Sequence, residues 1–137
     1  MERCFKLFTP IILVLVFSSC HSSKIQYPLK LEVASSQTWD AGAKHRGTKV
    51  EAILVGDTEH VKITSLIFRS KRTIPIIKSI DGKLFVTANF EYGTEKKSVE
   101  SVIDDRPDMI IYSYKGKEYE LPLKDIQRKS MKYYPKQ

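Results

Sequence analysis

The chain has 137 residues and a formal net charge of +7, from 23 lysines and arginines against 16 acidic residues. This length suffices for one domain with its own apolar core, which would bury roughly two-thirds of the surface of the extended chain. Both cysteines, Cys4 and Cys20, lie within the first twenty residues, which excludes a disulfide framework or cysteine chemistry in the rest of the chain.

Residues 1–19 have the pattern of a secretory signal. Arg3 and Lys6 make the start of the chain positive, and an almost wholly apolar run over residues 7–17 follows them. A transmembrane helix is the alternative, but it needs about 20 apolar residues, and this run is shorter and contains Pro10. The sequence therefore predicts export, and export makes anionic headgroups, envelope glycans or an acidic protein better partners for a basic chain than nucleic acid.

Phe17-Ser18-Ser19-Cys20 resembles the lipobox of bacterial lipoproteins, with phenylalanine where leucine is commoner. The resemblance implies that the signal is removed and that Cys20 becomes the acylated first residue of a membrane-anchored protein. Residues 20–27 would then be a lipidated tether, which reaches at most about 25 Å when fully extended. An ordinary signal peptide with an incidental cysteine is the alternative.

The rest of the chain is rich in valine, isoleucine, threonine and tyrosine, which favours strands. Leu29, Leu31 and Val33 alternate with polar residues, as in a half-buried strand. Asp81-Gly82 predicts a tight hairpin turn, although Pro75 in its first arm indicates an edge strand. Further strand patterns cover residues 39–43, 49–55, 61–68, 74–80, 84–90, 99–103, 109–114 and 118–123.

This spacing of short strands and turns predicts an all-β fold over residues 28–124. We expect an antiparallel immunoglobulin-like β-sandwich of about seven or eight strands, with a small, partly open β-barrel as the alternative. Trp39 is expected to be the large core side chain between the two sheets. Residues 125–137 are expected to form a basic tail, either a short helix or a frayed strand.

Trp39-x-Ala41-Gly42, together with Gly47 and the strand from Lys49, loosely resembles uncharacterised small lipoproteins of Bacteroidota. That resemblance implies no activity and no functional residues. In that phylum, lipoproteins displayed on the cell surface look to carry acidic residues directly after the lipidated cysteine, and residues 21–24 of this chain contain none. The resemblance therefore implies an outer-membrane location facing the periplasm.

No residue set predicts chemistry. The histidines His21, His45 and His60 lack zinc-ligand spacing, and the sequence contains no G-x-S-x-G turn of a serine hydrolase. The acidic group around Asp104 is interrupted by Arg106-Pro107 and is expected to be a solvated turn rather than a calcium loop. We therefore assign no catalytic residue, no cofactor and no metal site.

Aromatic and basic residues near the end of the chain are the candidates for contact with a partner or the membrane. Exposed rings can stack on sugars or on a protein, although cross-strand packing explains the same tyrosines. Each lysine close to an anionic surface can add about 1 kcal/mol of attraction, although a solubilising tail is equally consistent with them. The candidates are Tyr112, Tyr114, Tyr119, Lys129, Lys132, Tyr133 and Tyr134.

The sequence thus favours a non-enzymatic envelope module that binds or scaffolds another envelope component. Two alternatives stay open. A small envelope hydrolase would need a concave pocket with polar groups of perturbed pKa. A carrier of an apolar ligand would need an internal cavity.

Overall fold

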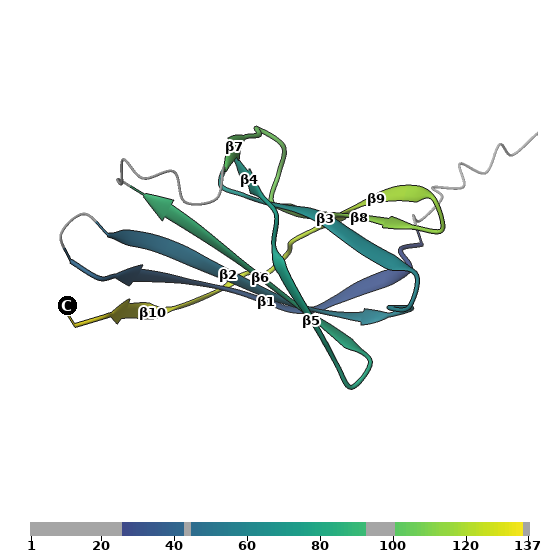
Figure 1. The fold of residues 1–137 in the computed structure, drawn as a ribbon, viewed down its shortest axis with the longest axis horizontal. Helices are drawn as coiled ribbons and strands as arrows, with labels where there is room; N and C mark the ends of the chain where they lie inside the picture. Colours follow the sequence, from purple (N-terminus) through teal and green to yellow (C-terminus); the bar gives the residue numbers. More distant parts are fainter. Residues whose placement is uncertain (1–25, 43–44, 93–100, 136–137) are drawn as a thin grey trace, which may run out of the picture.

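The computed structural model describes residues 26–42, 45–92 and 101–135. These residues form two five-stranded sheets (Figure 1). Sheet A has the order β10-β1-β2-β6-β5, and sheet B has the order β7-β4-β3-β8-β9. The bounds in sheet A are β10 (Gln127–Tyr133), β1 (Leu29–Asp40), β2 (Arg46–Gly56), β6 (Lys83–Tyr92) and β5 (Ile76–Ile80). Those in sheet B are β7 (Val102–Ile103), β4 (Lys71–Thr73), β3 (Val61–Phe68), β8 (Met109–Tyr114) and β9 (Lys117–Pro122).

The predicted all-β, mainly antiparallel sandwich is confirmed. Within the described ranges every regular element is a strand, and none is a helix that could span a membrane. The Asp81-Gly82 hairpin is also confirmed, with φ angles of 50° and 74°, since a type I′ turn requires positive φ at both central residues. Lys115-Gly116 connects β8 to β9 with φ angles of 48° and 79°.

The C-terminal segment contains a strand, which was one of its two predicted forms, but this strand belongs to the sandwich, which the prediction ended at residue 124. β10 pairs in parallel with β1 from Ser35–Gln127 to Asp40–Tyr133, and it forms one edge of sheet A. Leu123 is buried and Ile126 packs against the core as the chain crosses from sheet B to sheet A. The sandwich therefore continues to Tyr133. With the short strands β4 and β7, the described residues contain ten strands instead of seven or eight.

A β-bulge in β1 decides which side chains face the core. Leu31 pairs with the buried Leu54, but the register shifts before Val33, so that Val33 pairs with Ile53. One extra residue in a strand moves every later side chain to the opposite face of the sheet. The prediction that Val33 shares a face with Leu31 was therefore wrong. The predicted core position of Trp39 was also wrong, because this residue lies on the outer face of sheet A and is only partly buried.

The main core lies between the sheets and is built from alternate residues of each strand. Phe90 from sheet A and Phe68 from sheet B meet with ring centroids 5.9 Å apart. Tyr112 is fully buried, and its ring stacks on that of Tyr119 at 5.4 Å. The other buried apolar members are Leu29, Ala34, Val50, Ala52, Leu54, Ile63, Leu66, Leu84, Val86, Ala88, Ile110, Leu121 and Leu123.

A second, smaller cluster lies on the outer face of sheet B. Its members are the buried Ile67, Met109 and Ile111. Arg72 pairs with Ile67, and Glu120 pairs with Ile111, across neighbouring strands. Residues directly opposite each other in an antiparallel pair share a face, so the two charged side chains flank this cluster.

An ion-pair network joins these charges. The Asp104 carboxylate accepts hydrogen bonds from Arg106 at 2.7 Å and from Arg72 at 3.4 Å, and Arg106 also donates to Glu120 at 2.9 Å. The Asp104 side chain is only 11% exposed, so the predicted solvated turn is instead a structured loop that ties β4 to β9.

This network predicts a pH-dependent stability. The hydrogen bonds from Arg106 hold the pKa of Asp104 at about 2, below its ordinary value of 3.8. A carboxyl whose pKa is lowered by folding stabilises the fold above its unfolded pKa, and this contribution is lost as the pH falls towards the folded pKa. We expect the urea midpoint of the wild type to fall between about pH 4 and pH 2. Asp104→Asn should lower the urea midpoint at pH 7 and reduce the dependence of the midpoint on pH between about pH 4 and pH 2. If the midpoint of this variant falls as steeply with pH as that of the wild type, Asp104 is not the group responsible.

Candidate functional site

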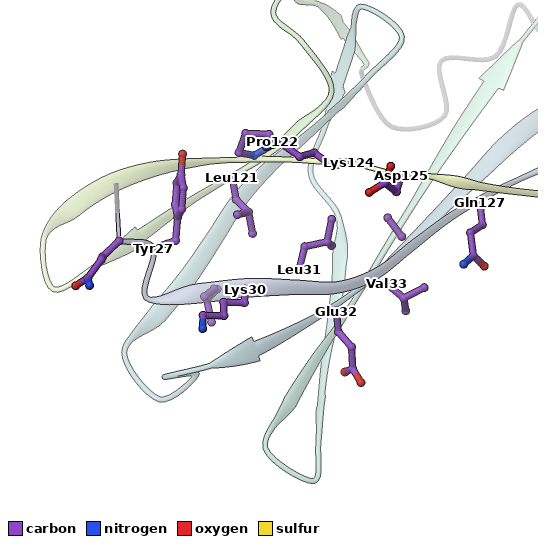
Figure 2. A pocket seen from close by; sticks show the side chains of 13 residues that line it. Tyr27, Lys30, Leu31, Glu32, Val33, Leu121, Pro122, Lys124, Asp125 and Gln127 are labelled. Atoms are coloured by element: carbon purple, nitrogen blue, oxygen red, sulfur yellow. The ribbon is translucent and has the colours of Figure 1, made fainter. Parts of the chain in front are cut away.

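One hollow lies where the chain enters the domain (Figure 2). It has a volume of about 870 Å³ and runs between the start of β1 and the segment from β9 to β10. Leu31 and Leu121 point into it, whereas Glu32 points away and Lys124 lies at its rim. Leu31 and Leu121 also belong to the packing of the core, so this hollow is the open end of the sandwich rather than a separate site.

Two smaller hollows adjoin each other on the outer face of sheet A. One has a volume of about 480 Å³, and its apolar lining residues include Val33, Ile53 and Phe85. The other has a volume of about 380 Å³, and Thr87 lines both. We call the second hollow the Trp39 cleft; its lining residues are Trp39, Lys49, Thr87, Asn89, Glu91 and Tyr134.

The position of the indole follows from the strand next to it. Trp39 on β1 pairs with Gly47 on β2, and a Cβ atom added to Gly47 would lie 2.7 Å from Cζ2 of the indole. The ring therefore occupies the space above β2 that any other residue at position 47 would fill. The Nε1–H group of Trp39 donates a hydrogen bond of 2.8 Å to Oδ1 of Asn89 on β6. The indole thus extends from β1 across β2 to β6. Its Cβ attachment to β1 and its hydrogen bond to Asn89 fix its position.

Tyr134 forms the wall of the cleft. Its ring stands at 75° to the indole, with centroids 6.3 Å apart. The backbone N–H of Tyr134 donates to the carbonyl of Asp40 at 2.9 Å, which continues the β1–β10 pairing beyond the end of β10. The ammonium of Lys132 lies 4.9 Å from the centre of the Tyr134 ring. The cleft thus has a fixed aromatic floor and an aromatic wall.

Charged side chains connect the two hollows. Glu51 accepts from Lys49 at 2.8 Å and from Lys129 at 3.4 Å. The hydrogen bond from Lys49 is the main reason that the pKa of Glu51 is below its ordinary value, and Lys129 lowers it further. A carboxylate with two lysines keeps this face polar between its aromatic and aliphatic parts.

The seven candidate contact residues do not form one surface. Tyr112 is fully buried, and its hydroxyl accepts from the backbone N–H of Leu29 at 3.4 Å. The prediction of Tyr112 as a contact was therefore wrong, because the alternation of β8 directs this ring into the core. Tyr119 is half-buried against it.

The other candidates lie at two places. Tyr114 is half-buried, and its hydroxyl donates a hydrogen bond to the Asp57 carboxylate. This hydrogen bond holds the pKa of the Asp57 carboxyl below its ordinary value. Lys129, Lys132, Tyr133 and Tyr134 lie on or just after β10. Of these, Tyr134 lines the Trp39 cleft and Lys129 lines the neighbouring hollow. The candidate lipidation site, Cys20, lies outside the described residues.

Sequence reasoning missed Trp39, Lys49 and Asn89 as members of a site. They come from three strands, and only the sheet order brings them together. A single tryptophan opposite a glycine is a signal of this site, but the sequence alone does not show that Trp39 and Gly47 are opposite each other. That requires the register of β1 and β2.

The described histidines and acidic residues do not form a cluster of metal ligands. His60 lies 3.9 Å from the Asp57 carboxylate and contacts Tyr114 edge-on. Across residues 26–42, 45–92 and 101–135, no three His, Cys, Asp or Glu side chains gather as metal ligands would. His21 falls outside these ranges.

Comparison of the chain with protein-family models, with curated proteins and with solved structures finds no match.

Proposed function

We propose that this chain is a non-enzymatic, lipid-anchored protein of the cell envelope that binds a glycan in the Trp39 cleft. The observation that carries this proposal is the fixed indole, which lies over Gly47, with Tyr134 as a wall and polar groups around it. The predicted signal and the lipobox resemblance of Cys20 support the anchor. The resemblance to Bacteroidota lipoproteins and the lack of acidic residues at positions 21–24 support an outer-membrane location that faces the periplasm.

The chemistry of the cleft suits a sugar ring. The face of an aromatic ring carries partial negative charge, which attracts the polarised C–H groups on one side of a pyranose. Lys49, Asn89 and Glu91 line the same cleft, and their polar atoms match the hydroxyl and amide groups at the edge of such a ring. A few polar groups around an apolar floor are typical of sites that fix the orientation of a ligand.

The direction of β1 supports the proposal. The strand begins at Leu29, next to the tether, and reaches Trp39 near its other end. At roughly 3.3 Å per residue, the cleft lies about 30 Å from the start of the strand. A domain held by residues 20–27 would therefore carry its cleft on the side away from the membrane.

Trp39 is the only tryptophan in the chain, so its fluorescence reports on this cleft alone. We expect purified peptidoglycan sacculi to sediment the soluble domain saturably, and soluble glycan strands to shift its emission. Trp39→Ala should weaken binding by about 2 kcal/mol or more, as at other aromatic anchors, which is roughly thirty-fold in Kd. Tyr134→Ala should also weaken binding.

Tyr133→Ala is the matched control, because Tyr133 is 74% exposed and does not line the cleft. Equal binding by all three variants and the wild type would refute the glycan proposal. In cells, the wild type should incorporate a labelled fatty acid and Cys20→Ser should not, while the purified domain keeps its glycan affinity. A wild type that incorporates no fatty acid would refute the anchor alone.

A further inference from the structure

Exposed aliphatic side chains are concentrated on β5, on β7 and on the residue before Pro75. Ile74-Pro75 leads from β4, which pairs with β7 in sheet B, directly into β5 in sheet A. Six of the nine exposed large apolar side chains of the described residues belong to these segments. They are Ile74, Ile76, Ile77, Ile80, Val102 and Ile103, with exposures from 38% to 79%.

Within the described part of the chain, β5 pairs with β6 alone, so the other edge of its backbone has no neighbouring strand. Ile80 and Lys83 flank the two-residue turn and therefore form a hydrogen-bonded pair; such pairs alternate along the ladder. It follows that the N–H and C=O groups of Ser79 and Ile77 point away from β6, towards solvent.

The other three sheet edges have features that discourage the addition of a further strand. β10 carries Arg128, Lys129 and Lys132, and β9 carries charges at three of its six positions. β7 has only two residues. Lysines, charges and short length discourage the addition of a further strand. β5, with the sequence Ile-Ile-Lys-Ser-Ile, has a single charge, at Lys78.

The position of Lys78 discourages pairing with a second copy of this chain. Symmetric antiparallel pairing through the free groups of Ile77 and Ser79 places Lys78 opposite its own counterpart, in a pair whose side chains are close together. Like charges directly opposite each other are destabilising. An acidic residue at that position would instead be attracted. No Asp or Glu of this chain has aliphatic residues two positions away on both sides, so the chain does not itself supply a well-matched strand.

We propose that β5 is the docking edge for an extended segment of another protein, added antiparallel to it as a sixth strand of sheet A. The segment carries a carboxylate opposite Lys78 and aliphatic side chains opposite Ile76 and Ile80. These three residues share the outer face of the sheet, because they pair with Thr87, Phe85 and Lys83 of β6. Backbone bonds to Ile77 and Ser79 supply affinity, and Lys78 supplies the choice of partner.

A pair of synthetic peptides tests this edge. Both have the core Val-Thr-X-Thr-Val between threonine and serine flanks, with X as Glu or Lys. The mature protein should bind the Glu peptide saturably and about ten-fold more tightly than the Lys peptide, since attraction replaces repulsion at one cross-strand pair. Lys78→Glu should reverse this preference. Equal affinity for the two peptides, or binding to neither, would overturn the proposal.

Backbone N-methylation distinguishes strand addition from simple charge attraction. Methylation of either threonine that faces Ser79 or Ile77 should abolish binding, because these N–H groups donate to β5. Methylation of the central Glu should be tolerated, because its N–H points away. Equal effects at both positions would overturn strand addition. Wild-type self-association that Ile77→Asp abolishes would reassign the edge to a second copy. Trp39→Ala should bind the peptide normally, which keeps this result separate from the glycan proposal.

Discussion

Tyr112→Ala is expected to lower the free energy of unfolding by about 3–5 kcal/mol, the range measured for removal of a large aromatic side chain from a protein core. Tyr112 is fully buried and stacks on Tyr119 with an angle of 13° between the rings. Its loss would leave a cavity between β8, β9 and the start of β1. Urea unfolding followed by circular dichroism measures the change. A loss below about 1 kcal/mol would mean that the core collapses around the cavity.

Tyr112→Phe separates the hydroxyl from the ring. The backbone N–H of Leu29 is buried and donates to this hydroxyl, so phenylalanine leaves a buried donor without its acceptor. We expect a cost of about 1–3 kcal/mol, the usual penalty for such a group. Burial also raises the pKa of the Tyr112 hydroxyl, so its ultraviolet titration should lie at higher pH than that of an exposed tyrosine.

Gly47→Ala is expected to have the second large effect, on stability and on the cleft together. The added Cβ would lie 2.6 Å from the carbonyl oxygen of Phe90 and 2.7 Å from the Trp39 ring. The Phe90 oxygen belongs to the backbone of the neighbouring strand and cannot turn aside. We expect a loss of about 1–3 kcal/mol, as for other overpacked sites. The indole would also be displaced, with a shift in its fluorescence and weaker glycan binding.

Gly116→Ala provides the control for this substitution. Gly116 has a φ of 79° in the β8–β9 turn, and nothing lies within 4 Å of an added Cβ. Alanine there should cost about 1 kcal/mol through its backbone conformation alone and leave the tryptophan emission unchanged. If both variants shift the emission equally, the contact between Gly47 and the indole is not what positions the ring.

The hairpins could be predicted because their signals are local. Asp81-Gly82 specifies its turn within two residues, and the strands on either side pair without a register shift. β1 shows where such reasoning fails. Nothing in Leu29-Lys30-Leu31-Glu32-Val33 marks a bulge, because the apolar alternation continues through it. The bulge reflects pairing with β2, and it alone moves Trp39 from the core to the surface.

For β10, the sequence left a short helix and a frayed strand as alternatives and could not decide between them. All seven of its residues are exposed, so no apolar alternation marks it as a strand. Its position depends on the free edge of β1 and on the anchoring of Leu123 and Ile126 in the core. Of the cleft residues, Tyr134 was named from composition near the chain end, whereas Lys49 and Asn89 needed the pairing of β2 with β6.

The position of β1 inside sheet A also has a mechanical meaning. The proposed anchor joins the chain just before Leu29, and the proposed ligand rests on Trp39, so both act on the same strand. Tension between the membrane and a bound polymer would pull β1 along its own axis. β2 on one side and β10 on the other hold it through hydrogen bonds that lie across this axis. Such a load shears many bonds at once instead of unzipping them singly, so the strand between the two attachments is the one in sheet A best placed to carry force.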